Sequence, residues 1–281
     1  MDSMRGAYEQ QQIDAIEAWE AQPPSTMART MGFLAAPLAW AAQKVVPEEV
    51  MEKAIDAALN AAAAVSGSDD LLAESKKLGF EAASCRDFAN APLHISDGLS
   101  DTVSDWAKGL AAAEGAVTGM TGLVGLTADI PALLVLAIRT IRRIGACYGF
   151  DTSAEVERSF LLQALRAGSA NTAEDKKDAV AGAAEIRAVL DGTSTAISTR
   201  EQGAILGREA FTAAVRNLAK QLCINLTRRK AAQAIPLVGG GVGAAMNVLF
   251  ISDVAEAALR LYQKRRLEIH AVQVSVAIAK K

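Results

Sequence analysis

The chain has 281 residues, of which 51% are hydrophobic and 5% aromatic, and its net charge is −3. Its two histidines stand too far apart for the usual zinc-binding spacings, so the sequence predicts no metal site. No Walker-type phosphate loop occurs. The glycines of 239–244 lack the preceding strand and the later acidic residue that a dinucleotide fingerprint needs. We therefore expect no bound cofactor.

Alanine dominates the composition with 58 residues, and alanine is the strongest helix former. No proline-rich, serine-rich or low-complexity linker divides the chain. These features predict an all-α multi-helix bundle that forms a single domain over residues 1–281. The three cysteines show no CxxC spacing and the N-terminal residues form no apolar leader, which together favour the cytoplasm.

Charge is distributed unevenly along the chain. Residues 1–100 carry a net charge of −8, whereas residues 201–281 carry +7. Basic residues of the C-terminal part stand close to apolar stretches, as expected of a surface that faces anionic lipid; solvated helix ends are the alternative interpretation. The lipid-facing candidates are Arg228, Arg229, Lys230, Lys264, Arg265 and Arg266. Few aromatic residues accompany them, so nucleic acid is not an expected partner.

The N-terminal part predicts three helices. Apolar residues recur at near-helical spacing at Tyr8, Ile13, Ile16 and Trp19. This helix should end at Pro23. Residues 27–43 are mostly apolar, but their uncharged part is too short to span a bilayer, which favours a core helix. Another helix should begin after Pro47, where acidic residues complement the helix dipole, and Ser66-Gly67-Ser68 should close it.

The middle of the chain predicts one long helix over 99–128. Asp129-Ile130-Pro131 should interrupt it, because proline lacks a backbone donor and disfavours the helical region for the residue before it. Asp129 would then cap the next helix, which should end at Gly149 after a basic last part.

The remaining residues also show helical patterns. Thr152 and Glu155 are spaced as a capping box. Helices are expected over 173–190, 199–229 and 242–267. The tail HAVQVSVAIA (270–279) alternates for a few positions, so a short C-terminal strand is an alternative there.

Two stretches combine glycine with a lack of charge. On a helix, Gly115, Gly119, Gly122 and Gly125 would share one stripe, and Gly239, Gly243 and Asn247 would form a second. Because glycine destabilises a helix interior, we expect the two glycine-striped helices to pack closely on each other. The 14 uncharged residues of 115–128 are too short to cross a bilayer, and Pro236 shortens the 22 of 231–252.

Two acidic residues stand beside these apolar stretches. If buried, Asp129 and Asp253 each need a cation, for which Arg139, Arg142 and Arg143 are candidates. A structural ion pair is the first interpretation. A hydrolase with a buried acidic site near Asp129 and Asp253 is a rival hypothesis, and a helical carrier of an apolar ligand is another.

The segment 113–151, AEGAVTGMTGLVGLTADIPALLVLAIRTIRRIGACYGFD, resembles the central signature of the bacterial EcsC family. The segments IPLVGGGVGAAMN and LYQKRRLE, within 235–268, are similar to its C-terminal signature, and Tyr8 to Trp19 to its opening. The matching residues are Gly115, Gly119, Gly122, Asp129, Pro131, Tyr148, Gly149, Asp151, Pro236, Gly239, Gly243 and Asn247. We assign no catalytic residue from the resemblance. Judged by residue type, the matching residues are mostly packing and helix-break positions.

The resemblance implies a helical protein of a family whose namesake is encoded beside an ATP-binding-cassette transporter linked to secretion. We therefore expect a non-catalytic accessory protein, cytoplasmic and peripheral to the inner membrane face. Its expected partner is an anionic membrane surface or a membrane transporter. The sequence indicates no oligomeric state.

Overall fold

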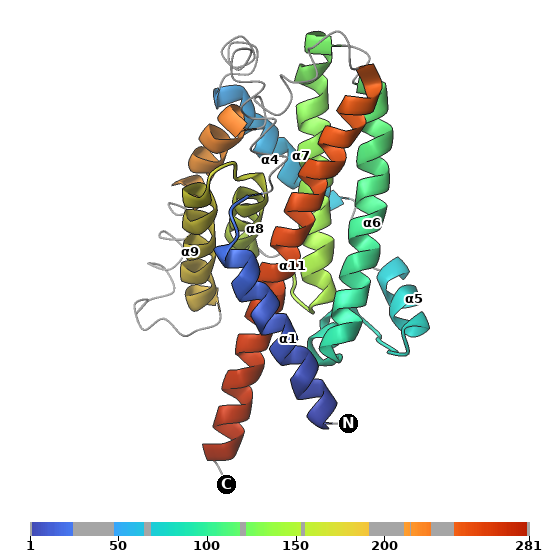
Figure 1. Cartoon of the computed structure of the whole chain (residues 1–281), viewed down its shortest axis with the longest axis vertical. Coiled ribbons are helices and arrows are strands. Elements are labelled where there is room, and N and C mark those ends of the chain that lie inside the picture. Colours follow the sequence, from blue (N-terminus) through green and yellow to red (C-terminus); the bar gives the residue numbers. More distant parts are fainter. Residues whose placement is uncertain are drawn as a thin grey trace.

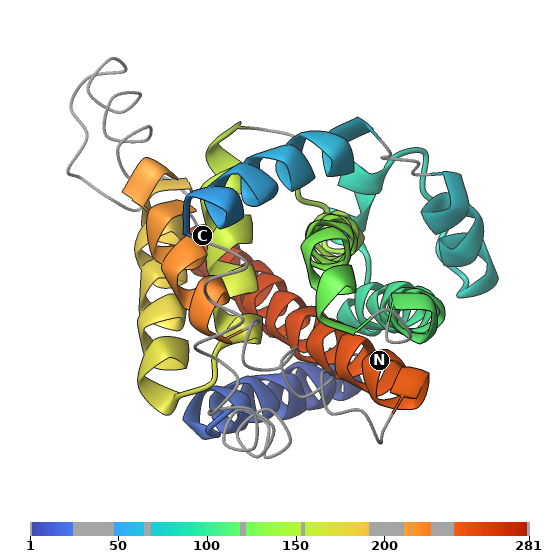
Figure 2. The same ribbon diagram turned by 90° about the horizontal axis from the view of Figure 1, so that it is seen from above.

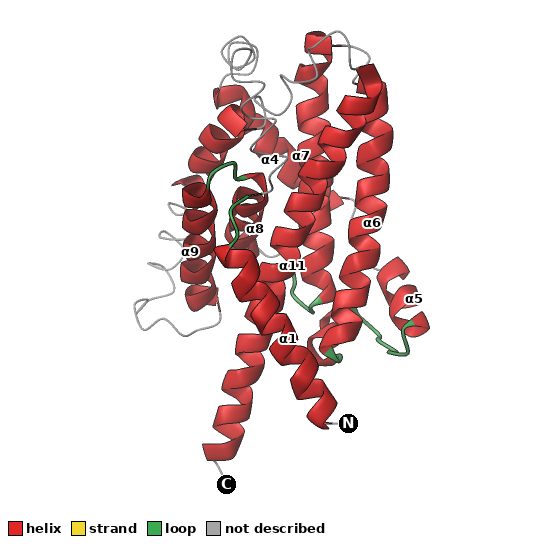
Figure 3. Cartoon of the chain, viewed as in Figure 1, coloured by secondary structure: helices red, strands yellow, loops and turns green. Residues whose placement is uncertain are grey.

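The computed structural model describes residues 2–24, 48–64, 69–118, 122–152, 155–190, 211–213, 215–225 and 239–279. All regular structure in these ranges is helical (Figure 3), which confirms the all-α class. The elements are α1 (Asp2–Ala21), α4 (Glu48–Ala64), α5 (Asp69–Lys77), the 3-10 helix η1 (Cys85–Asn90), α6 (Leu93–Thr118), α7 (Gly122–Cys147), α8 (Glu155–Ser169), α9 (Ala173–Leu190) and α11 (Gly239–Ala279), with further helical residues at 211–213 and 215–225.

Three long helices, α6, α7 and α11, form the centre of the bundle. Both α7 and α11 run antiparallel to α6 (Figure 1). Helix α11 packs against α6 along most of the length of α6. A hydrogen bond of 3.0 Å between Asp97 on α6 and Gln263 on α11 sets their register. Since both helices rise about 1.5 Å per residue, Gly115 lies at the level of Ala245. The segment of α6 that carries Gly115 therefore lies level with the beginning of α11, which places one glycine of the first predicted stripe beside the second glycine-bearing helix.

The other helices surround this centre. Helices α8 and α9 pack on each other beside α11, on the side away from α6 (Figure 2). Helix α4 covers α7, and α1 crosses α11. Helix α11 therefore has neighbours on several sides. Its buried residues cover more than a single face, which is typical of a helix in the core. They include Phe250, Ile251, Val254, Ala255, Ala257, Ala258, Leu261 and Tyr262.

Several helix ends lie where local chemistry predicts them. Helix α1 ends at Ala21, just before the two prolines, and its Ile16 and Trp19 are buried. Helix α4 begins at Glu48. Helix α7 ends at Cys147, and Gly149 has a φ of 86°, a left-handed conformation that favours glycine. The core helix expected over 27–43 and the end expected at 66–68 lie outside the described residues.

The single helix predicted over 99–128 is wrong. Helix α6 begins at Leu93 and ends at Thr118, and the chain runs back as α7 from Gly122. The predicted stripe of four glycines on one helix is therefore divided, with Gly115 on α6 and Gly122 and Gly125 on α7. Glycine has a low helix propensity, so a glycine-rich stretch favours a reversal as readily as a continuous helix.

The break predicted at Asp129-Ile130-Pro131 is also wrong, because Pro131 lies inside the continuous helix α7. An interior proline costs about 3 kcal/mol. Its neighbours Ile130, Leu133 and Leu134 are almost completely buried. Burying each such side chain contributes about 1.5–3 kcal/mol, so packing on both sides of Pro131 outweighs the local penalty.

The tail is helical, since α11 continues to Ala279, and the alternative of a short C-terminal strand is wrong. A strand needs a partner strand, whereas a helix that is already packed extends without a new nucleation step. Within the described ranges, no helix is both long and apolar enough to cross a membrane.

Candidate functional site

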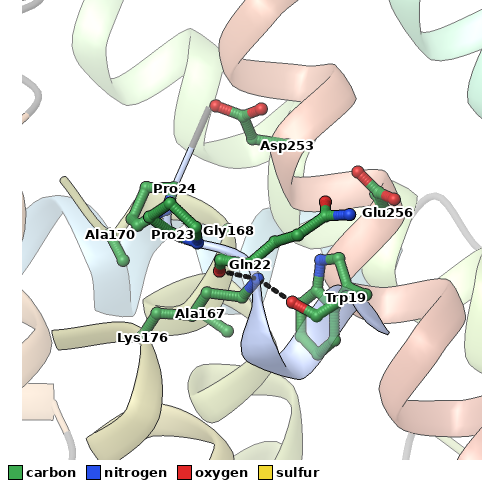
Figure 4. A pocket seen from close by; sticks show the side chains of 10 residues that line it. All are labelled: Trp19, Gln22, Pro23, Pro24, Ala167, Gly168, Ala170, Lys176, Asp253 and Glu256. Atoms are coloured by element: carbon green, nitrogen blue, oxygen red, sulfur yellow. Dashed lines mark hydrogen bonds between the residues drawn. The ribbon is translucent and has the colours of Figure 1, made fainter. Parts of the chain in front are cut away.

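A cavity of about 120 Å³ lies where the C-terminal end of α1 meets α8, α9 and α11 (Figure 4). We call it the α1 cavity. The polar side chains in its wall belong to Gln22, Lys176, Asp253 and Glu256. Beside it, a methyl group added at Gly168 would lie 2.5 Å from Cα of Val254, so α8 and α11 touch backbone to backbone there.

Lys176 anchors the end of α1 at this cavity. It is 5% exposed, and its ammonium group donates hydrogen bonds to the carbonyl oxygens of Trp19 and of Gln22, the latter at 3.0 Å (Figure 4). The ammonium also lies 4.2 Å from the centre of the Trp19 ring. Carbonyls at a helix C-terminus lack intrahelical donors and carry partial negative charge, so a cation stabilises them. Nothing in the local sequence distinguishes Lys176 from the adjacent Lys177.

Two carboxylates complete the wall. Asp253 and Glu256 lie three residues apart on α11, on one face of the helix, and both line the α1 cavity (Figure 4). Burial lowers the pKa of Lys176, while the negative charges of Glu256, Glu20 and Asp253 raise it. This polar space suits a few water molecules or a small polar molecule, and it is too small and too polar for an acyl chain.

A second group of polar side chains surrounds the buried Asp97; Tyr148 and Gln263 are buried and Tyr8 is half-buried. Tyr8 donates a hydrogen bond to Oδ2 at 2.7 Å, and Tyr148 donates one to Oδ1 at 2.5 Å. Gln263 donates to both oxygens at 3.0 Å. We call these four residues the Asp97 cluster. Because its members come from α1, α6, α11 and the residue after α7, the cluster joins all four parts of the chain.

Electrostatics in the Asp97 cluster is dominated by burial. Burial raises the pKa of Asp97, although the hydrogen bonds from Tyr148, Tyr8 and Gln263 oppose this. Burial and the adjacent Asp97 also raise the pKa of Tyr148. Both carboxylate oxygens already accept hydrogen bonds from protein donors. The arrangement therefore suits a structural joint better than a site that receives a ligand.

The basic residues 264–266 differ from the prediction that they face lipid. Arg265 is 4% exposed, and its guanidinium donates to both carboxylate oxygens of Glu157 at 2.8 Å. Arg266 donates to the carbonyl oxygens of Phe88 and of Ala91. Lys264 pairs with Glu20 at 2.7 Å. These cations bind the protein itself, because α11 is surrounded by other helices at this point.

The arginines near the predicted acidic site have other partners. Arg143 pairs with Asp70, and the guanidinium of Arg139 lies 4.7 Å from the centre of the Trp106 ring. Asp253 lies at the α1 cavity with Lys176. The structure therefore does not bring Asp253 to the arginines of α7. The side chain of Asp129 lies outside the described residues.

The residues that match the family signatures are spread over the bundle. Gly115 is buried, Pro131 is half-buried and Asn247 is completely buried. Tyr148 belongs to the Asp97 cluster, and Asp151 binds Arg86 at 3.0 Å. Gly122, Gly239 and Gly243 belong to helices α7 and α11. Gly119, Arg228, Arg229, Lys230 and Pro236 lie outside the described residues.

Sequence reasoning missed most of both sites. Asp97 and Gln263 stand at helical positions with no motif around them, and Lys176 lies in an ordinary charged segment. The sequence points to four of their residues: Asp253 as a candidate buried acid, Tyr148 through the family signature, and Tyr8 and Trp19 as apolar positions of the first helix. Within the described ranges, no group of three or more potential ligands is placed to hold a metal ion.

Comparisons with known proteins agree with the signatures. The model of the EcsC protein family matches residues 10–267. The chain is also 30% identical over 193 residues to a Bacillus subtilis (strain 168) protein whose name is "Uncharacterized protein YdbA". This match covers 66% of the chain and 62% of that relative, so the chain spans less than two thirds of the relative's length. No solved structure matches the chain.

Proposed function

The chain belongs to the EcsC protein family, and we propose that it acts as a peripheral membrane protein that binds an anionic lipid surface. In this proposal the protein is an accessory that works by binding, without catalysis. The observation that carries it is the position of the uncharged segments at one end of the bundle.

The end of α6, the beginning of α7 and the beginning of α11 lie together at one end of the molecule (Figure 1). We call this the uncharged end, because the sequence has no charge over 115–128 or over 231–252. Uncharged segments that are too short to cross a bilayer suit shallow contact with a membrane surface.

Charge supports the choice of an anionic surface. Arg228, Arg229 and Lys230 immediately precede the uncharged stretch that leads into α11. A basic cluster next to an apolar segment binds anionic lipid, each cation contributing about 1 kcal/mol near such a surface. Since residues 264–266 bind protein groups, this attraction is assigned to residues 228–230 alone.

Binding is favoured over catalysis because the buried charged side chains of Lys176, Asp97 and Arg265 already have partners within the protein. Lys176 binds two carbonyls, Asp97 accepts hydrogen bonds from three side chains, and Arg265 binds Glu157. The α1 cavity also gives no support to the alternative of a carrier for an apolar ligand.

Flotation with protein-free vesicles tests the proposal. At low salt the protein should float with vesicles that contain anionic lipid, and binding should weaken with added salt and with zwitterionic vesicles. Leu123→Glu, in the first turn of α7, should abolish flotation because it places a charge at the uncharged end. Val274→Glu is the matched control, since Val274 is 48% exposed at the other end of α11.

Two results would contradict the proposal. One is a protein that stays unbound with anionic vesicles at low salt. The other is equal flotation of Leu123→Glu and the parent protein. Binding to native membranes but not to protein-free vesicles would replace the lipid with a membrane protein, such as a transporter, as the partner.

A further inference from the structure

Another cavity, of about 140 Å³, lies where the N-terminal half of α1, the connection from η1 to α6 and the last third of α11 meet. We call it the α6 cavity, because the first residue of α6 belongs to its wall. The α1 cavity lies beside the other end of α1 and shares no lining residue with it. The polar side chains of the α6 cavity belong to Glu9, Asn90, Arg266, His270 and Gln273, and the rest of its wall is apolar.

Arg266 supplies the positive charge of this wall, and the protein fixes its orientation. The guanidinium is half-buried and donates hydrogen bonds to the carbonyl oxygens of Phe88 and of Ala91, the latter at 2.6 Å, and to Oγ of Ser96 at 3.4 Å. These contacts leave further N–H groups of the guanidinium without an acceptor within the described ranges. None of the three acceptors is charged, so in the part of the chain that the structure describes no ion pair neutralises this guanidinium.

The other four polar side chains of the wall also lack protein partners, since none of them makes a side-chain hydrogen bond or ion pair within the described ranges. Arg266, His270 and Gln273 follow one another at intervals of four and three residues, so they lie on one face of α11. Glu9 is the one carboxylate of this wall, and it comes from α1. The α6 cavity is therefore lined by hydrogen-bonding groups that a bound molecule can use.

The charges of the wall specify two ends of a ligand. A guanidinium matches a carboxylate, because its N–H groups pair with two oxygens, and the positive dipole end of α6 lies at the same wall. The carboxylate of Glu9 matches an ammonium group. A simple anion would be repelled by Glu9, and a simple cation would be repelled by Arg266. A small molecule that carries both charges avoids each repulsion.

We propose that the α6 cavity binds a small zwitterion of the α-amino-acid class, with its carboxylate on Arg266 and its ammonium group on Glu9. His270 and Gln273 supply further hydrogen bonds from the same face of α11. The volume of about 140 Å³ is below that of a pocket for a drug-sized molecule, so the site does not suit a long peptide or an acyl chain. Because Leu93 and Leu267 belong to the apolar part of the wall, we expect an aliphatic side chain on the ligand.

This site is separate from the proposed membrane contact. The uncharged end includes the beginning of α11, whereas Arg266 and Gln273 belong to its last third. The inference therefore goes beyond the proposed function and does not depend on it.

Calorimetric titration of the full chain tests the site with glycine, L-alanine, L-valine and L-leucine at pH 7 and constant ionic strength. At least one of these amino acids should bind saturably, with one molecule per chain. The tightest binder is compared with its analogue without the amino group and its analogue without the carboxylate, which for L-valine are isovalerate and isobutylamine. Each analogue should bind at least about tenfold more weakly, because it loses one charged, hydrogen-bonded pair.

Glu9→Gln tests the ammonium end of the site, since it keeps the size of the side chain and removes its charge. Affinity for the amino acid should fall by about tenfold, whereas affinity for the analogue without the amino group should stay equal or rise, because the repulsion is removed. Glu17→Gln is the matched control, since Glu17 is exposed on α1 and lies outside the wall. The amino acid should raise the melting temperature of Glu17→Gln as much as that of the parent, and that of Glu9→Gln less.

The inference is overturned if none of the four amino acids binds saturably, or if Glu9→Gln binds the amino acid as tightly as the parent does. Equal affinity of the parent for the amino acid and for the analogue without the amino group would also contradict it, since the site would then recognise a carboxylate alone.

Flotation with anionic vesicles separates this inference from the proposed function. Glu9→Gln should float as the parent does, because the α6 cavity is not part of the uncharged end. Amino-acid binding by a protein that does not float would contradict the membrane proposal and support this site. Flotation without amino-acid binding would support the membrane proposal and overturn this site.

Discussion

At the scale of single residues, Asp97 is the shared acceptor of its cluster, because the other three side chains all donate hydrogen bonds to it. Asp97→Ala leaves the donors of Tyr8, Tyr148 and Gln263 without their shared acceptor. We expect a loss of about 3 kcal/mol in the free energy of unfolding at pH 7, because buried donors without partners are costly. Asp97→Asn should lose less, since its amide oxygen still accepts. Denaturant titrations measure both variants. A free energy of unfolding of Asp97→Ala equal to that of the parent would contradict the structural role of the Asp97 cluster.

The same residue predicts a dependence on pH. Burial raises the pKa of Asp97 in the folded protein above its value in the unfolded chain. Its contribution to stability is therefore full below the unfolded pKa, about 3.9, and is lost as the pH rises through the folded pKa. Relative to Asp97→Asn, the parent should gain stability as the pH is lowered from 7 to 4. A difference that stays constant or reverses over this range would contradict it.

Residue-scale chemistry is the part that sequence reasoning predicts least. Tyr148 and Asp151 were found through a family signature, but their partners Asp97 and Arg86 stand 51 and 65 residues away along the chain. Nothing local marks such pairs, because only the packing of α6 and η1 against α7 brings these side chains together.

At the scale of elements, Lys176 should hold α1 on the bundle. Lys176→Met removes the cation from the last carbonyls of α1 and from the Trp19 ring. We expect faster hydrogen exchange throughout α1 with little change in α7, since local opening follows the loss of local contacts. The adjacent and exposed Lys177→Met is the matched control. Equal hydrogen exchange in α1 of the two variants would contradict the role of Lys176 in holding α1.

Close helix contacts give a second prediction at this scale. Gly168→Ala would place a methyl group 2.5 Å from Cα of Val254, so α8 and α11 must separate. We expect a loss of about 1–3 kcal/mol in unfolding free energy. Gly109→Ala, on the exposed face of α6 with nothing within 4 Å, should instead stabilise by up to about 1 kcal/mol. A higher melting temperature for Gly168→Ala than for Gly109→Ala would refute the backbone contact between α8 and α11.

Helix ends show where sequence reasoning succeeds and fails. The ends near Pro23, Glu48 and Gly149 were predicted because their causes are local. The break at Pro131 was wrong because the burial of Leu133 and its neighbours, which is a tertiary effect, outweighs the local penalty of proline.

At the scale of the whole molecule, the helical class follows from composition, whereas the predicted stripe of four glycines on one helix is divided between α6 and α7. The inward direction of Arg265 does not, because a net charge of +7 over 201–281 gives no information about which cations are buried. The uncharged ends of α6, α7 and α11 lie together at one end of the bundle, and this end is the basis of the proposed function.

The most direct test of that function is the depth of the uncharged end in a bilayer. Cys85 and Cys223 are replaced by serine, the buried Cys147 is kept, and an environment-sensitive dye is attached at Leu123→Cys or at Val274→Cys. With anionic vesicles, the dye at 123 should shift to the blue and be quenched by brominated lipid, while the dye at 274 should not change. Quenching at 274 alone, or at neither position, would contradict the account.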